Sequence, residues 1–130
     1  MNITLKGTFV DNLSIIRGEG EANKFDFSFT TGFADENPCH FFIIFDLAIV
    51  IPAGYLLNTK YIAQFESDVP IAEELREQLP VFKINAPAIA YPFLRSYIAT
   101  VLLNSGLPPV MLPTINFIEL AKQHETPASP

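Results

Sequence analysis

Apolar and polar residues alternate in three stretches of the first half of the chain. Apolar residues fall at odd-numbered positions between residues 3 and 15, and the same alternation recurs in residues 60–67. The clearest case is residues 24–30, where single polar residues separate three phenylalanines: Phe25, Phe27 and Phe29. A period of two is typical of a strand that buries one face and leaves the other in water.

A fourth stretch, residues 41–51, is apolar at nearly every position. This pattern predicts a central strand whose two faces are both covered. Asp46 is the charged residue inside it, and we interpret it as a charge near a sheet edge or an interface that discourages wrong strand pairing. Together the four stretches predict a four-stranded antiparallel sheet.

Helical patterns follow the strands. Residues 72–79 indicate a short, solvated helical connector that ends at Pro80. A long helix is expected from Asn85, which serves as its N-cap, to residue 104, with a kink at Pro92. Because this helix is apolar around most of its circumference, it needs cover on two sides.

The last helix is expected after Asn116, whose side chain caps it while Glu119 completes a capping box. From residue 125 onward the sequence holds nothing to bury, and we expect a flexible tail. The predicted fold class is therefore α+β: a four-stranded antiparallel sheet followed by a long helix and a short C-terminal helix, in a single domain over residues 1–124.

The amino-acid composition limits the classes of molecule that this chain can bind. The chain has 130 residues, is 49% hydrophobic and carries a net charge of −6 at pH 7, so it is too apolar for disorder and too acidic for a nucleic-acid partner. Its most apolar stretches are interrupted by Asp46 or by prolines, which argues against membrane insertion. The single Cys39 and the absence of a signal-peptide pattern indicate the cytoplasm. So much apolar surface on a small subunit predicts association.

Catalytic and metal-binding patterns are not recognisable in the sequence. Cys39 and His40 are neighbours on a strand, so they project to opposite faces and cannot share a proton. His124 has no second ligand nearby, and the six glycines form no phosphate-binding loop. We therefore expect neither an enzyme nor a cofactor. The twelve phenylalanines and four tyrosines favour a binding surface instead.

The C-terminal half carries a more specific signal. The segment Ala86-Pro-Ala-Ile-Ala-Tyr-Pro-Phe-Leu-Arg-Ser-Tyr-Ile is followed by Ser105-Gly106, a proline-rich linker and Ile-Asn-Phe at 115–117. In order and spacing these motifs resemble the SecB family of protein-export chaperones over about residues 85–122, while the first half is similar in layout only. The resemblance implies dimers that pair through their sheets and stack in twos through the long helix, with these residues at the interface: Phe93, Tyr97, Ile98 and Val101.

The resemblance also implies a function. SecB proteins hold unfolded precursor polypeptides in apolar grooves, keep them competent for export and pass them to the motor ATPase of the translocase, without using nucleotide or metal themselves. Carried over by position, the client-binding candidates are Phe27, Phe29, Tyr61, Phe65, Leu79, Phe82 and Leu120. The chain is thus expected to be an ATP-independent holdase.

The sequence departs from the SecB pattern at the face that docks the motor ATPase. In the family its docking face carries acidic residues on the first and fourth strands, whereas the corresponding positions here are Asn12, Ile16 and Gln64. Chaperoning is therefore better supported than delivery to the motor. Three alternatives stay open: a SecB-like chaperone dedicated to one client such as an antitoxin, a carrier of a small apolar ligand, and a structural subunit whose apolar faces are all permanent interface.

Overall fold

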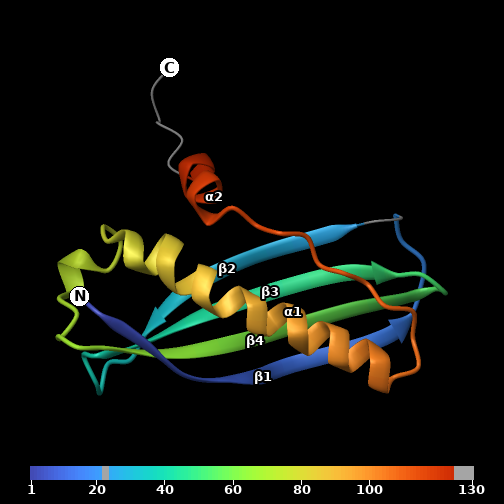
Figure 1. The fold of residues 1–130 in the computed structure, drawn as a ribbon, viewed down its shortest axis with the longest axis horizontal. Helices are drawn as coiled ribbons and strands as arrows, with labels where there is room; N and C mark the ends of the chain where they lie inside the picture. The colour runs from blue at the N-terminus through green and yellow to red at the C-terminus, as the bar shows by residue number, and fades with distance from the viewer. Residues whose placement is uncertain (22–23, 125–130) are drawn as a thin grey trace.

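The computed structural model describes residues 1–21 and 24–124. Its four strands are β1 (Ile3–Arg17), β2 (Phe25–Phe33), β3 (His40–Ile51) and β4 (Tyr55–Ser67), and they form one antiparallel sheet in the order β1-β4-β3-β2. The long helix α1 (Ala86–Asn104) crosses one face, and α2 (Phe117–His124) lies at the β2 side (Figure 1). The predicted fold class is confirmed. The domain boundary at 124 stays a prediction, and the expected tail, residues 125–130, lies outside the described residues.

The two faces of the sheet differ, and β3 shows how. Its odd-numbered residues from Phe41 to Ile51 are buried on the inner face, beneath α1, while its even-numbered residues are partly exposed on the outer face. β3 lies between β4 and β2, so it is central as predicted. Within a single chain, however, only its inner face is fully covered, because both helices lie on that side of the sheet.

Aromatic rings and one stripe of α1 build the core. The helix turns Leu94, Ile98 and Leu102 toward the sheet, at the spacing of four residues that places side chains on one helix face. At the β2–β3 end, Phe82 packs edge-on against Phe41, with ring centroids 4.9 Å apart. These contacts hold the helical layer against the inner face.

The start of the helical layer differs from the expectation. The connector holds the short 3₁₀ helix η1 (Glu73–Leu75), and a π-helical turn, η2 (Val81–Asn85), leads directly into α1. Pro80 therefore begins a helical run instead of ending one, in keeping with the preference of proline for a first helical position. Asn85 is not an N-cap, since its backbone is already helical and its side chain makes no capping bond. Burial of Phe82 draws this extra turn onto the sheet.

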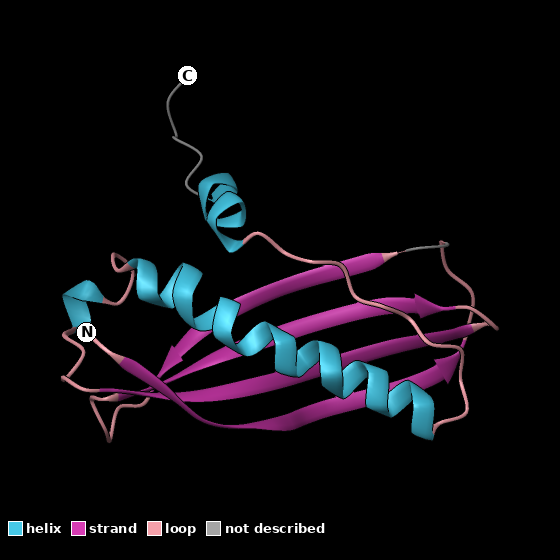
Figure 2. Cartoon of the chain, in the orientation of Figure 1, coloured by secondary structure: helices cyan, strands magenta, loops and turns pink. Residues whose placement is uncertain are grey.

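The linker after α1 returns along the sheet to α2 (Figure 2). The cap expected for α2 is confirmed, because Asn116 Oδ1 accepts hydrogen bonds from the backbone N–H groups of Ile118 and Glu119 at 3.0 and 3.1 Å. The Glu119 carboxylate lies 3.6 Å from Lys122 Nζ. Among the described residues, one helix, Val81–Asn104, is long and apolar enough to cross a membrane by those two criteria alone, and its inner side packs on the sheet.

Candidate functional site

An aromatic row lines the inner face of β2 at the edge of the sheet. Phe25 and Phe27 stack with ring centroids 5.8 Å apart, and Phe27 lies 6.5 Å from Phe29. Phe33 continues the same parity at the end of the strand. All four rings, which we call the aromatic row, are only partly buried. Because β2 is an edge strand, the row has core on one side and solvent on the other.

α2 closes part of this edge. Its Phe117 is buried and packs edge-on against Phe29 at 5.7 Å and Phe27 at 6.3 Å. Phe117 also meets Tyr91 of α1 at 5.8 Å. The short helix is therefore held by rings from both β2 and α1, and it leaves an open space on each side along the strand.

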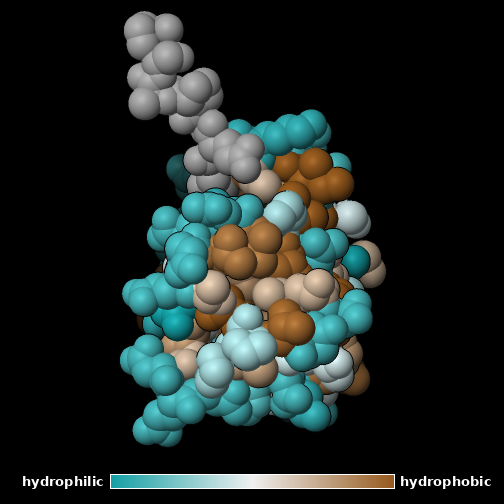
Figure 3. All heavy atoms as spheres, turned by 90° about the vertical axis from the view of Figure 1, so that its left-hand side faces the viewer, coloured by the Kyte–Doolittle hydropathy of each residue, from teal (hydrophilic) through white to brown (hydrophobic). Residues whose placement is uncertain are grey.

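The first of these spaces is a hollow of about 960 Å³ between β2, the connector and α2, which we call the connector hollow. Phe29 and Phe33 supply aromatic surface, the buried Phe82 lies at its floor, and Leu120 lines it from α2. Charged residues of the connector and η2 border it: Glu73, Glu74, Arg76, Glu77 and Lys83. Seen from the connector end of the molecule, apolar side chains form a patch with hydrophilic residues around it (Figure 3).

The second space is a hollow of about 790 Å³ at the other end of β2, which we call the linker hollow. It lies between Phe25, the β3–β4 turn and the proline-rich linker, with Val110 and Met111 among its apolar residues. The aromatic row thus runs from one hollow to the other. We call the row and its two hollows the β2 groove.

Tyr91 anchors the linker that shapes this groove. Its hydroxyl donates a hydrogen bond of 2.6 Å to the carbonyl oxygen of Pro113. Burial raises the pKa of Tyr91 to about 12, against a smaller opposing effect of the Arg95 charge. The hydroxyl therefore stays protonated, and able to donate, well above neutral pH.

Tyr91→Phe is expected to lower the free energy of unfolding by about 1 kcal/mol at pH 7, because Pro113 loses its donor. The wild type should also lose stability as the pH rises from the unfolded tyrosine pKa of 10.0 toward about 12, since only the unfolded chain then ionises at this position. Urea denaturation at pH 8 and pH 11 measures both effects. The drop between the two pH values should be about 1 kcal/mol larger in the wild type than in the variant. Equal drops would contradict the assigned pKa.

The structure divides the seven client-binding candidates into two groups. Phe27 and Phe29 belong to the aromatic row, and Leu120 lines the connector hollow, at whose floor Phe82 is buried. Leu79, on the connector, is partly buried against the core. By contrast, two candidates on β4 lie in the core beneath α1: Tyr61 and Phe65. Tyr61 stacks on Tyr97 at 4.9 Å and donates a hydrogen bond of 2.7 Å to Thr8 Oγ1, while Phe65 stacks on Phe41 at 5.2 Å. These two side chains face α1 instead of the β2 groove.

The client-binding candidates omit Phe25 and Phe33 of the aromatic row, Arg76 of the connector hollow, and Phe117, which packs against the row. Phe33 shares the parity of Phe25, Phe27 and Phe29, so the alternation contained a signal for it. Arg76 and Phe117 carried no comparable signal, since their placement depends on how the helical layer folds back onto β2.

The four residues that the resemblance places at an oligomer interface differ in their exposure to solvent. Phe93 is 48% exposed on the outer side of α1, and Tyr97 and Val101 are partly buried. Ile98 is fully buried against the sheet. A second chain resting on α1 would meet Phe93 but not Ile98.

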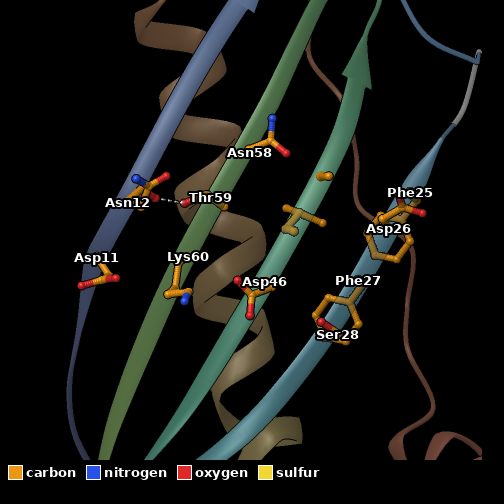
Figure 4. Close-up of a pocket in the computed structure, with 12 residues that line it drawn as sticks. Asp11, Asn12, Phe25, Asp26, Phe27, Ser28, Asp46, Asn58, Thr59 and Lys60 are labelled. Carbon is orange, nitrogen blue, oxygen red and sulfur yellow. Dashed lines mark hydrogen bonds between the residues drawn. The ribbon is translucent and has the colours of Figure 1, made fainter.

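The outer face of the sheet carries a polar hollow of about 650 Å³ (Figure 4). Asp46 lies there on the central strand β3, directly opposite Lys60 of β4. Because β3 is an inner strand, Asp46 does not stand near a sheet edge, so that part of the expectation is wrong, while the interface alternative stays a prediction. Its side chain is partly exposed on the outer face, which allows an interior strand to carry the charge. The strand register places Asn12, Ile16 and Gln64 on this same outer face.

His40 and Cys39 have separate surroundings. His40 Nε2 lies 3.2 Å from Glu66 Oε2 on the neighbouring strand and 3.3 Å from Asn37 Nδ2. Cys39 is a free, partly buried thiol. Within residues 1–21 and 24–124, no group of three or more His, Cys, Asp or Glu side chains is arranged to hold a metal ion.

Comparison with known sequences gives consistent matches. The family model "Preprotein translocase subunit SecB" matches residues 53–128, more than half of the chain. The protein-export protein SecB of Paramagnetospirillum magneticum is 33% identical over 69 residues, which cover 52% of this chain and 41% of that protein. SecB of Ehrlichia chaffeensis is 39% identical over 68 residues, covering 49% and 39%. The matched stretch thus spans about two fifths of the length of these relatives.

Solved structures share the fold over most of the chain. The Mycobacterium tuberculosis SecB-like chaperone Rv1957, solved in complex with a ChAD peptide from the antitoxin HigA1, aligns with a TM-score of 0.63 at 14% identity and covers 88% of each chain. A Streptococcus agalactiae protein of unknown function aligns with a TM-score of 0.56, also at 14% identity, and covers 88% of this chain and 98% of that one. At this identity the likeness concerns the fold.

Proposed function

This chain belongs to the SecB family, and from that premise we propose that it is a chaperone that holds unfolded polypeptide segments in the β2 groove. The observation that carries the proposal is the aromatic row, which stays partly exposed although both helices pack beside it. Apolar rings that remain accessible between two open hollows offer a surface for extended apolar chain. The proposed site of action is the cytoplasm.

The energetics favour reversible holding. Each apolar client side chain that the groove buries contributes roughly 1.5 to 3 kcal/mol. Ordering each client backbone residue costs about 1 to 2 kcal/mol. The net gain per residue is small, so binding needs many contacts and release needs no energy source. We therefore propose that holding is independent of ATP and keeps a client unfolded, as export requires.

A direct experiment measures binding and aggregation together. A reduced, unfolded model protein is diluted from denaturant with an equimolar amount of the chaperone, and light scattering follows aggregation with and without ATP. We expect slower aggregation and no effect of ATP. Aggregation at the rate of the client alone, with no complex in native mass spectrometry, would refute the proposal.

A dedicated client is the second candidate function. It is favoured by the Mycobacterium tuberculosis SecB-like chaperone, whose fold matches over 88% of this chain and which was solved with a peptide of an antitoxin. In that case one natural polypeptide binds far more tightly than unrelated unfolded proteins. Competition of unfolded proteins with a single selected peptide tests this. A small apolar ligand fits less well, since both hollows open onto the surface instead of enclosing a cavity.

Apolar surface that one chain leaves uncovered supports self-association. Phe93, Ile89 and Leu103 are exposed on the outer side of α1. β1 is a 15-residue edge strand with further exposed apolar residues, among them Phe9 and Ile16. An open edge of this length is a template for pairing with another strand. We propose that copies pair through β1 and that pairs stack through α1.

Phe93→Asp is expected to weaken association through α1 by about tenfold or more, because a carboxylate replaces a ring that the second copy covers. Sedimentation velocity over a dilution series measures the change. Val69→Asp is the matched control, since Val69 is 44% exposed, close to the 48% of Phe93, and lies off α1. If both variants associate like the wild type, α1 is not an interface.

A further inference from the structure

The outer face of the sheet carries a row of apolar side chains that neither α1 nor α2 covers. Phe9 of β1, Ile62 of β4 and Ile44 of β3 lie directly opposite one another on neighbouring strands. Phe42 lies two residues from Ile44, on the same face of β3. Phe9 is 47% exposed, and the other three side chains are partly exposed. We call these four residues the outer ladder. An exposed apolar patch of this kind is typical of a binding surface.

Polar residues border the outer ladder on both sides. On one side, Lys60 and Asp46 lie opposite each other in the polar hollow of the outer face (Figure 4). On the other side, His40 and Glu66 pair across their strands, with Nε2 and Oε2 3.2 Å apart. The outer ladder is therefore a narrow apolar strip that runs across the strands.

The outer ladder meets the β2 groove at the open edge of the sheet. Thr30 of β2 lies opposite Ile44, and the same Thr30 lines the connector hollow. Two residues further on, Gly32 lies opposite Phe42 and has no side chain that could stand between the hollow and the ladder. A Cβ atom at Gly32 would lie 3.4 Å from Ile44 Cδ1. A polypeptide that leaves the connector hollow at this point can therefore continue onto the ladder.

The size of the outer ladder favours an extended chain as its occupant over a second folded copy. Even an aromatic side chain contributes no more than about 150 to 250 Å², and all four residues are partly buried already. Together they offer much less than the roughly 800 Å² per partner of a stable protein–protein interface. From Thr30 to Phe9 the ladder crosses three strand spacings, about 14 Å, which about four or five extended residues span.

We propose that the outer ladder is a second binding surface for the same unfolded client: a segment that leaves the connector hollow passes over Thr30 and Gly32 and crosses the outer face toward β1. This inference rests on the proposed function. A long client gains contacts on the ladder that a short peptide cannot reach. Because each residue contributes only a small net gain, these added contacts favour long unfolded chains over short exposed loops of folded proteins.

The test compares three fluorescently labelled, unstructured peptides, with Kd measured by anisotropy. The first is an apolar peptide of about nine residues, the length of β2. The other two add about eight residues at each end, enough to cross the ladder, and these extensions are apolar in one peptide and Gly-Ser in the other. In the wild type, the apolar extensions should lower Kd about tenfold relative to the Gly-Ser extensions. Ile44→Thr should reduce this gain to about twofold, because the ladder loses apolar surface while threonine keeps the β-branched shape that suits a strand. The Kd of the short peptide should not change, since that peptide does not reach the ladder.

Ile16→Thr is the matched control, because Ile16 is 54% exposed on the outer face but lies outside the ladder. It should keep the full gain from the apolar extensions. Phe9→Ala is a second ladder variant and should also reduce the gain, and urea denaturation confirms that each variant folds. Unchanged gains in both ladder variants, or an equal loss in Ile16→Thr, would overturn the inference. If the ladder variants weaken self-association in sedimentation velocity and leave the gain unchanged, the ladder binds a second copy instead. If the wild type does not bind even the short peptide, the proposed function itself fails.

Discussion

Replacing Phe65 with alanine is expected to lower the free energy of unfolding by about 3 to 5 kcal/mol. The ring has no solvent exposure, stacks on Phe41 at 5.2 Å and lies beneath α1. Removing it opens a cavity between sheet and helix that rigid neighbours fill poorly. Urea denaturation followed by far-UV circular dichroism measures the change. Because total stabilities of small domains are themselves about 5 to 15 kcal/mol, part of the variant is expected to be unfolded in mild conditions.

The matched control is Phe9→Ala, the same substitution on the other face of the sheet. Phe9 is 47% exposed on β1 and pairs with the outward-facing Ile62. Its loss should cost no more than about 1 kcal/mol in the monomer. If Phe65→Ala were as stable as Phe9→Ala but failed to bind unfolded clients, Phe65 would be a groove residue and the packing described above would be wrong.

The strands were predictable because alternation is a local signal. A period of two reports that Phe25, Phe27 and Phe29 lie on one side of their strand, and that Tyr61 and Phe65 lie on one side of theirs. It does not report which strand lies under the helix and which lies at the edge. That depends on the order β1-β4-β3-β2, which places β4 beneath α1 and leaves β2 at the margin. Candidates with the same pattern therefore divide between core and groove.

Helix ends were only partly predictable for a related reason. Asn116 caps α2 as expected, because capping involves residues within one turn. Asn85 met the same local criterion but lies inside a helical run that begins at Pro80. The long-range packing of Phe82 against Phe33 and Phe41 decides that position. Burial of an aromatic ring through tertiary contacts therefore overrides the local capping preference of a residue.

Polar members of the site were the least predictable. The connector, residues 72–79, reads as a solvated helical turn, and most of its charges are indeed exposed. Arg76 departs from this pattern only because the fold brings it over Phe33, more than 40 positions earlier in the chain. No spacing rule within the connector distinguishes it from its charged neighbours. Long-range contacts of this kind require the three-dimensional structure.

Leu120→Asp is expected to weaken binding of unfolded clients by about a hundredfold. It should also lower the free energy of unfolding by about 1 to 2 kcal/mol, because the partly buried Leu120 side chain packs against the core. Leu120 lines the connector hollow from α2, and a client that covers it would have to bury the new carboxylate near Glu73, Glu74 and Glu77. Asp at this position lies in the first turn of the helix, where a negative charge is favourable. Anisotropy with a labelled unfolded client measures the affinity, and urea denaturation measures the stability.

Ile118→Asp is the matched control, which shows whether a loss of client affinity arises in the connector hollow or from any new charge on α2. Ile118 lies two residues earlier in the same first turn, so it experiences the same helix dipole, but it is 53% exposed and does not line the connector hollow. It should leave client affinity within about twofold of the wild type. Equal losses in both variants would show that clients contact α2 from outside the β2 groove, or that α2 itself moves on binding. A loss confined to Leu120→Asp would place the client between α2 and the aromatic row, where the apolar surface of this chain remains open.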